Sequence, residues 1–180
     1  MRIPILTSAV NEFRDGLEFK RQLRERELIE WQRVRRFMFV CTGNICRSPY
    51  GAEVARRLAI PSLSSGIDTH TNLPANASAR SVAARRGVDL SGHLTTQWKD
   101  VVPGDDLLII AMESHHLRAV RAVAARANAQ VTLMSVWCTP PQVRIADPYG
   151  KDDAFFMRCF DQIDAALQSL AESYRRQRAA

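Results

Sequence analysis

The chain has 180 residues, 46% of them hydrophobic and 24% charged, a composition that suits one globular domain with a substantial core. No apolar run approaches the roughly 18 residues that a membrane span needs, and residues 3–10 make a poor signal peptide. We therefore expect a cytoplasmic protein without a transmembrane segment. The net charge is +6, but the sequence has no basic stripe interleaved with aromatic residues, the pattern that is typical of a nucleic-acid-binding surface. No nucleic-acid partner is therefore expected. Local positive charge around an anion site would suit a phosphorylated substrate.

The first predicted element is a helix over residues 11–36. Apolar side chains such as Phe13 and Trp31 recur there at loosely helical spacing, between arginines and glutamates. The composition changes after this segment, so we predict an N-terminal helical extension over residues 1–35 and a main domain over residues 36–180. The pattern leaves open whether the extension docks to a partner through an amphipathic face or packs loosely.

The main domain is predicted to begin with a strand and two helices. Residues Arg36–Val40 form a short, apolar, β-prone run that is typical of a buried strand. A helix is predicted over Ser48–Ala59, with Ser48 as its N-cap and a proline at the first helical position. A second helix is predicted over Ser78–Arg86, and Gly87 is expected to end it.

The second half of the domain continues the alternation of strands and helices. The strongest strand signal is Leu107–Met112, and a helix is predicted after it over Glu113–Ala127. A strand over Val131–Met134 leads into a proline-containing loop at 137–150 and then a closing helix over Asp153–Arg176. This order indicates an α/β fold with a parallel sheet, in which sites lie in the loops that leave the carboxyl ends of the strands.

The loop after the first strand is the segment most suited to chemistry. It runs from the thiol of Cys41 through Thr-Gly-Asn-Ile-Cys to the guanidinium of Arg47, where a helix begins. Inward-pointing N–H groups of such a loop bind an anion, and the helix N-terminus adds partial positive charge. Gly43 and Asn44 tolerate the left-handed backbone angles of a tight loop, and Arg47 can hold two phosphate oxygens. The sequence therefore predicts a phosphate-binding loop.

Cys41 is the predicted nucleophile of this loop. The chain has four cysteines, at positions 41, 46, 138 and 159, without the paired spacing of a structural zinc site. A thiol at a helix N-terminus beside an arginine ionises readily, so Cys41 is expected to be a thiolate that attacks phosphorus at neutral pH. No metal ion or other cofactor is expected in the reaction.

The run VCTGNICRSP, from Val40 to Pro49, closely resembles the signature of the low-molecular-weight protein tyrosine phosphatases. Further segments similar to family motifs follow in order over about residues 36–176: Ser64-Ser65-Gly66, Gly87-Val88-Asp89-Leu90-Ser91-Gly92-His93 and Asp147-Pro148-Tyr149-Gly150. The resemblance implies a doubly wound fold, with a four-stranded parallel sheet and helices on both faces. It also implies a protein tyrosine phosphatase that works through a phosphocysteine intermediate.

The resemblance implies a role for each catalytic residue. Cys41 would carry the phosphoryl group, Arg47 would stabilise its charge, and Asp147 would protonate the leaving oxygen and then activate water. Ser48 would donate a hydrogen bond to the thiolate. The loop residues that would surround the phosphate are Thr42, Gly43, Asn44, Ile45, Cys46 and Ser48.

Supporting roles follow from the same resemblance. Asn44 would hold the loop in shape through hydrogen bonds to Ser65 and His93, and Tyr149 would form an aromatic wall beside the site. Cys46 would form a reversible disulfide with the nucleophile that protects it from irreversible oxidation. His70, His115 and His116 are expected to be solvated residues without a role.

The identity of the substrate is left with several alternatives. The family's second aromatic wall is missing near His70, which makes the chain similar to the bacterial branch, whose members suggest a phosphotyrosine-containing partner such as a tyrosine kinase. Ile45 favours a phenyl ring, whereas Thr42 is shared with protein arginine phosphatases, the main alternative. An arsenate reductase would need cysteines in residues 47–137, which have none. A non-catalytic phosphate-binding module is disfavoured because it would not need Cys41, Arg47 and Asp147 together.

Overall fold

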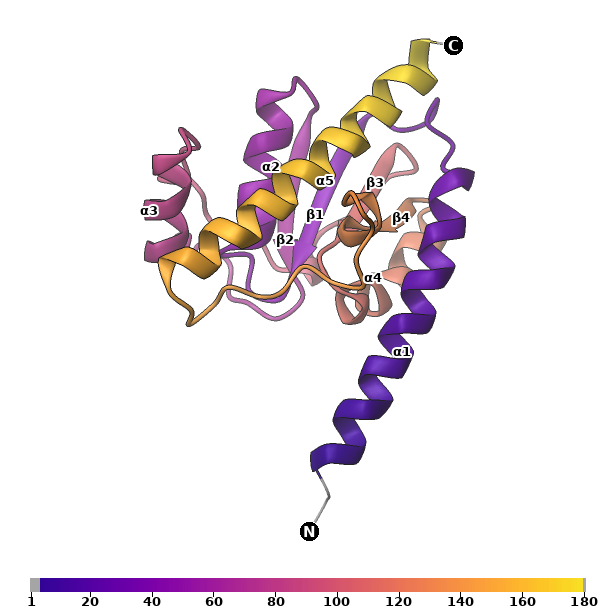
Figure 1. The fold of residues 1–180 in the computed structure, drawn as a ribbon. Coiled ribbons are helices and arrows are strands. Elements are labelled where there is room, and N and C mark those ends of the chain that lie inside the picture. The colour runs from indigo at the N-terminus through magenta and orange to yellow at the C-terminus, as the bar shows by residue number, and fades with distance from the viewer. Residues whose placement is uncertain (1–3, 180) are drawn as a thin grey trace.

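A computed structural model describes residues 4–179, with side chains from residue 9 onward (Figure 1). Its centre is a four-stranded parallel sheet with the strand order β2-β1-β3-β4. The strands are β1 (Arg36–Cys41), β2 (Ser62–Gly66), β3 (Leu107–Ala111) and β4 (Gln130–Leu133). The predicted α/β class and the four-stranded parallel sheet are confirmed.

Five α-helices and three 3-10 helices accompany the sheet in the described residues. The α-helices are α1 (Pro4–Glu25), α2 (Arg47–Arg57), α3 (Ala77–Arg85), α4 (Ser114–Arg126) and α5 (Asp153–Ala179). The 3-10 helices are η1 (Arg26–Leu28), η2 (Trp98–Asp100) and η3 (Met134–Trp137). Among these described helices, none has the length and apolar character needed to cross a bilayer.

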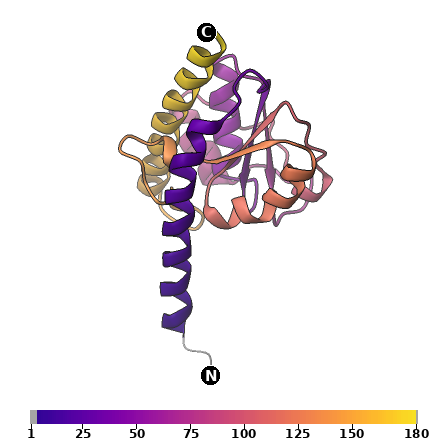
Figure 2. The same ribbon diagram turned by 90° about the vertical axis from the view of Figure 1, so that its right-hand side faces the viewer.

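Both faces of the sheet are covered because successive side chains of each strand point to opposite faces. Phe37 and Phe39 of β1 belong to the core beneath α2, α3 and α5. Met38 and Val40 of the same strand pack with Val120 of α4 on the opposite face. Figure 2 shows α5 and α4 on opposite sides of the sheet, so the fold is doubly wound.

Two predicted helix starts are corrected by the structure. Helix α2 begins at Arg47, with Cys46 as its N-cap, so Ser48 lies inside the first turn and bonds the thiol of Cys41 instead of capping the helix. Helix α3 begins earlier than predicted because Asn76 is its N-cap and accepts a hydrogen bond from the N–H of Ala79 at 3.1 Å.

The predicted helix over residues 11–36 is wrong at its C-terminal end. Helix α1 stops at Glu25, and the chain that follows places the side chains of Ile29, Trp31 and Val34 in the core. Trp31 is buried there and packs edge-to-face on Trp137, with ring centroids 5.8 Å apart. Tertiary packing of these apolar side chains outweighs the loosely helical spacing that suggested a continuous helix.

Helix α1 packs beside α4 and the edge strand β4, and it extends past the body of the domain (Figures 1 and 2). Its Glu18 pairs with Arg121 of α4 at 2.6 Å. Its Gln22 is fully buried, and the Gln22 side-chain oxygen accepts the N–H of Leu133 at 3.2 Å. The helix therefore caps a backbone donor at an edge strand that would otherwise be unpaired. Whether residues 1–35 form a separate unit remains a prediction, and residues 1–3 lie outside the described part.

We expect Gln22→Ala to lower the free energy of unfolding by about 1–3 kcal/mol, because the buried N–H of Leu133 would lose its acceptor. Asn11→Ala removes an exposed amide from the same helix and should change stability by less than about 0.5 kcal/mol. Chemical denaturation of both variants measures this difference. Equal stability of the two variants would show that α1 does not cap β4.

Candidate active site

The candidate site is a pocket of about 180 Å³ at the carboxyl ends of the central strands. It is lined by residues 41–47 except Asn44, together with Asp147 and Tyr149. The chain passes from β1 to β2 on one side and later returns to β3 on the other, so the pocket lies at the point where the strand order reverses. Open parallel sheets bind ligands at this position.

Asn44 fixes the loop that forms the base of the pocket. It is fully buried and has a left-handed backbone, with φ of 53°. Its side-chain oxygen accepts the N–H of Thr96 at 2.9 Å, and its carbonyl accepts a hydrogen bond from Nε2 of His93 at 2.7 Å. The loop is therefore tied to the segment before η2 by both the side chain and the backbone of one residue.

The Asn44 amide donates to Ser64 Oγ at 2.9 Å and to Ser48 Oγ at 2.8 Å, and not to Ser65 as expected. Neighbouring residues of a strand point to opposite faces, so only Ser64 of β2 presents its hydroxyl to Asn44. The Ser65 hydroxyl is buried and has no partner among the described residues, while its carbonyl accepts from Ser48 at 3.4 Å.

The end of β2 approaches the loop closely at Gly66. A Cβ atom at this position would lie 2.6 Å from the carbonyl oxygen of Thr42. This contact is too short, and because the oxygen belongs to the backbone it could not move away as a flexible side chain could. The N–H of Ile67 then donates to the carbonyl of Cys41 at 3.0 Å. Glycine at this position therefore lets β2 support the back of the loop.

The thiol of Cys41 lies at the end of β1 and is buried, with 3% of the residue exposed. The N–H of Asn44 donates to its sulfur at 3.2 Å, and Ser48 Oγ lies 3.0 Å from the same atom. Since the Asn44 amide donates to Ser48 Oγ, the single hydroxyl hydrogen of Ser48 has two acceptors within reach, the Cys41 sulfur at 3.0 Å and the Ser65 carbonyl at 3.4 Å. Helix α2 begins six residues after Cys41 and turns its N-terminus toward the loop. The sulfur therefore receives a backbone donor and lies near the positive end of a helix dipole.

Arg47 is 1% exposed and is held between two carboxylates. Its NH1 and NH2 groups lie 2.6 Å from Glu113 and 2.7 Å from Asp147, respectively. Burial lowers the Arg47 pKa, but nearby Cys41, Glu113 and Asp147 outweigh it, so the net pKa is raised and the guanidinium stays charged. Its Nε is buried without a partner among the described residues, which leaves a donor for an oxyanion ligand.

Asp147 and Tyr149 form the open side of the pocket. The Asp147 side chain is 44% exposed, and its second oxygen accepts the N–H of Tyr149 at 3.1 Å. Both residues line the pocket, and Tyr149 is 63% exposed. Asp147 is therefore a partly exposed carboxylate that lines the pocket and pairs with Arg47.

The other cysteines differ from Cys41 in their surroundings. Burial raises the pKa of Cys46, with Cys41 and Asp147 adding to the effect, so its thiol stays protonated at neutral pH. Burial also raises the pKa of Cys159 to about 12. All four cysteines are free thiols in this structure, and the protective disulfide between Cys41 and Cys46 remains a hypothesis.

Sequence reasoning missed two residues that support the site. Glu113, which holds Arg47, directly precedes α4 at the end of β3, where the rule for parallel sheets places functional side chains. His116 is fully buried, contrary to expectation, and its Nε2 lies 2.9 Å from the hydroxyl of Thr42. Burial chiefly, with neighbouring His115 and Arg47, lowers the pKa of His116 to about 2, so the ring is neutral. No sequence signal separated it from a solvated histidine.

Comparisons with known proteins show the family of this chain. Residues 36–180 match the family model described as low molecular weight phosphotyrosine protein phosphatase. The low molecular weight protein-tyrosine-phosphatase Etp of Escherichia coli K12 is 35% identical over 142 residues, which cover 77% of this chain and 94% of Etp. Residues 36–180, which the family model matches, contain every residue of the pocket.

Two solved structures share the fold. Wzb of Vibrio vulnificus in complex with benzylphosphonate has a TM-score of 0.67 at 29% identity, covering 77% of this chain and 98% of that one. The YwlE arginine phosphatase of Geobacillus stearothermophilus has a TM-score of 0.70 at 23% identity, covering 81% and 96%, respectively. At that identity the second likeness concerns the fold alone.

A pH dependence is expected from His93. Burial lowers the His93 pKa below its ordinary value of 6.5, although the hydrogen bond to Asn44 acts in the opposite direction. The folded chain therefore favours the neutral ring, and its contribution to stability is lost as the pH falls below 6.5. His93→Gln keeps a donor for the Asn44 carbonyl but does not titrate.

Denaturation at about pH 7.5 and about pH 5.5 should therefore show a smaller loss of stability in His93→Gln than in the parent chain. Exposed His70, changed to Gln, is the matched control and should keep the parent's pH dependence. An identical pH dependence in all three proteins would remove His93 from this role.

Proposed function

The chain belongs to the low molecular weight phosphotyrosine protein phosphatase family, and we propose that it hydrolyses phosphotyrosine in proteins through a phosphocysteine intermediate. One observation carries the proposal most directly. The sulfur of Cys41 receives the Asn44 N–H at 3.2 Å and lies 3.0 Å from Ser48 Oγ, at the base of a pocket that Arg47 and Asp147 border. These neighbours favour a thiolate beneath a phosphate-sized space.

In the first step, the Cys41 thiolate attacks phosphorus, so that a sulfur–phosphorus bond forms while the bond to the tyrosine oxygen breaks. Asp147 gives its proton to that leaving oxygen. Arg47 and the loop N–H groups bind the three equatorial oxygens, whose charge they stabilise in the transition state. Asp147 must leave Arg47 and turn toward the substrate, which its half-exposed side chain allows.

In the second step, water attacks the phosphocysteine. Asp147, now a carboxylate, takes a proton from the water, and the sulfur–phosphorus bond breaks to release phosphate and restore the Cys41 thiolate. The hydrogen bond from Ser48 makes sulfur a better leaving group because it stabilises the charge that returns to that atom. The products balance as tyrosine and inorganic phosphate, with no metal ion in the cycle.

Phosphotyrosine is the substrate best matched to the sides of the pocket. Ile45 supplies an apolar surface, and Tyr149 supplies an aromatic ring at the rim, both suited to a phenyl group. The benzylphosphonate complex of the related Wzb supports an aryl ligand in such a pocket. We place the reaction in the cytoplasm, since a catalytic thiolate needs reducing surroundings, and expect a tyrosine-phosphorylated protein such as a tyrosine kinase as the partner.

A side-by-side assay of phosphotyrosine peptide, phosphoarginine and arsenate tests this assignment. We expect the highest kcat/KM for phosphotyrosine and no arsenate reduction, because no cysteine in residues 47–137 could resolve an arsenic–sulfur intermediate. Preference for phosphoarginine would assign the chain to the arginine phosphatases. Binding of phosphate without any turnover would make the domain a binding module.

Cys41→Ser should lower the turnover of aryl phosphates by at least about a thousandfold, because a serine hydroxyl is not ionised at neutral pH. Cys138→Ser makes the same atomic change at a buried cysteine that does not line the pocket, and should keep most of the activity. Steady-state assays of both purified variants measure the effect. Substantial turnover by Cys41→Ser would contradict the mechanism.

Asp147→Asn should slow hydrolysis by about 10²–10⁴-fold for phenyl phosphate, whose leaving group needs a proton. The loss should be much smaller for a dinitrophenyl phosphate, because that phenolate leaves without protonation. The comparison of kcat for the two esters measures the acid role directly. Equal losses for both would assign Asp147 to binding rather than to proton transfer.

A further inference from the structure

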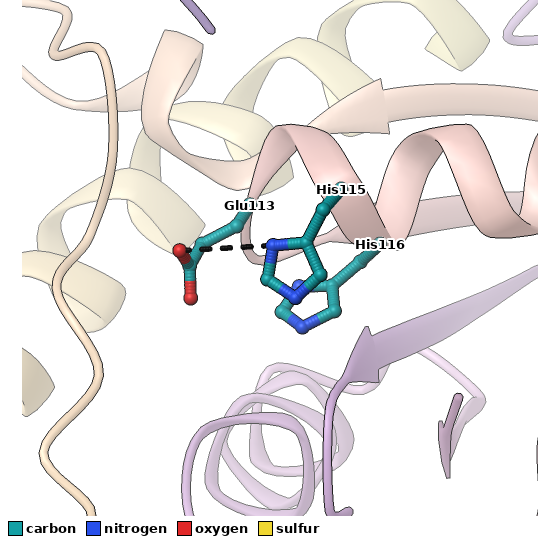
Figure 3. Close-up of side chains that lie close together, drawn as sticks. All are labelled: Glu113, His115 and His116. Atoms are coloured by element: carbon teal, nitrogen blue, oxygen red, sulfur yellow. Dashed lines mark ion pairs between the residues drawn. The ribbon is translucent and has the colours of Figure 1, made fainter. Parts of the chain in front are cut away.

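Three side chains that can bind a metal ion, one carboxylate and two imidazoles, meet at the start of α4, beside the proposed catalytic pocket. One ligand atom from each of Glu113, His115 and His116 lies within 4.8 Å of the other two. Figure 3 shows the carboxylate and the two rings gathered on one side of the helix start, with the Glu113 carboxylate 3.9 Å from Nδ1 of His115. The two imidazole rings are neighbours, with centroids 3.9 Å apart.

The donor set selects a class of ion. Two imidazole nitrogens and one carboxylate oxygen are the ligands of zinc-class divalent transition metals, and Ca²⁺ and Mg²⁺ prefer oxygen alone. Bonds of about 2.0–2.2 Å would bring these donors slightly closer together than they stand. The His115 side chain is 45% exposed and that of Glu113 is 20% exposed, so both have room to adjust.

A second observation concerns His116, which is fully buried and has an Nδ1 atom without a hydrogen-bond partner among the described residues. Buried polar atoms normally have a hydrogen-bond partner, so the unpartnered nitrogen is consistent with a ligand that binds there. Nε2 of the same ring lies 2.9 Å from the Thr42 hydroxyl. Metal-binding histidines commonly donate the other ring N–H to an oxygen in this way, which fixes the tautomer and the ring orientation.

The charge around the cluster also suits a dication. Among the described residues, Arg47 is the only arginine that pairs with Glu113 and Asp147, and the proposed thiolate of Cys41 would add a third negative charge beside it. Glu113 contacts Arg47 through one oxygen and faces His115 with the other, so it can bridge the guanidinium and an ion.

We propose that Glu113, His115 and His116 bind a zinc-class divalent cation, and that the bound ion slows the phosphatase reaction. The second part rests on the proposed function. An ion at this position shares the carboxylate that holds Arg47 and fixes the ring that holds Thr42, so it acts on two residues of the phosphate pocket. Its effect is regulatory, because the ion supplies no step of the reaction.

Titration of the chelator-treated full chain with Co²⁺ tests the binding site, since cobalt bound by nitrogen and oxygen gives visible absorption bands. We expect His115→Ala to weaken Co²⁺ binding by more than about tenfold, with Zn²⁺ displacing cobalt from the parent chain. His70→Ala, a matched change of an exposed histidine elsewhere, should bind as tightly as the parent. Equal affinity of His115→Ala and the parent would overturn the site.

Cys41→Ser separates this site from a metal bound by the nucleophile. It should keep Co²⁺ binding, and the parent complex should lack a thiolate-to-cobalt charge-transfer band. Loss of binding in Cys41→Ser would move the ion to the thiol and contradict the proposal. These binding results hold whatever substrate the chain hydrolyses, so a failure of the proposed function is seen separately.

The ratio of aryl phosphatase activity with Zn²⁺ to activity with chelator tests the regulatory part. We expect the parent and His70→Ala to lose activity in Zn²⁺, and His115→Ala to keep a ratio near one. The ratio corrects for any change that the substitution makes to metal-free activity. Equal inhibition of His115→Ala and the parent would contradict control through this cluster.

Discussion

The position of the Asn44 side chain is the constraint on which the site depends. Its amide joins Ser48 of α2 to Ser64 of β2, and its oxygen accepts from Thr96 before η2. The residue is fully buried and its backbone is left-handed, so these hydrogen bonds must outweigh an unfavourable backbone angle. The loop between β1 and α2 is thereby shaped before any ligand arrives.

The charges of the pocket are balanced by ion pairs that join the start of α2 to the segment after β3 and to the loop before α5. A buried guanidinium is costly unless it is paired, and Arg47 is paired with Glu113 and Asp147. Glu113 is less exposed than Asp147, at 20% against 44% of each side chain. Glu113 is thus the more enclosed of the two carboxylates, and the proposed mechanism requires the more exposed one, Asp147, to turn toward the substrate.

The strands β1, β3 and β4 could be predicted to within about one residue: β1 and β3 are mostly buried apolar runs, and β4 is a short β-prone segment after α4. The hydrophobic pattern did not reveal β2, because its sequence is mostly serine and glycine. These small residues let the strand lie against the phosphate loop. Residues 29–34 were mistaken for helix, since local spacing does not show that Trp31 packs on Trp137. The loop residues could be identified from their order, whereas the choice of Ser64 over Ser65 and the burial of His116 depend on tertiary contacts.

The most direct test of this account is the phosphate affinity of Asn44→Gly. Glycine accepts the left-handed backbone, so this variant removes the side-chain hydrogen bonds without adding backbone strain. Calorimetric titration of the folded variant should show phosphate binding weakened by about tenfold or more, as the loss of buried hydrogen bonds of about 1–3 kcal/mol implies. Phosphate affinity equal to that of the parent would show that the loop keeps its shape without Asn44, and would contradict the account.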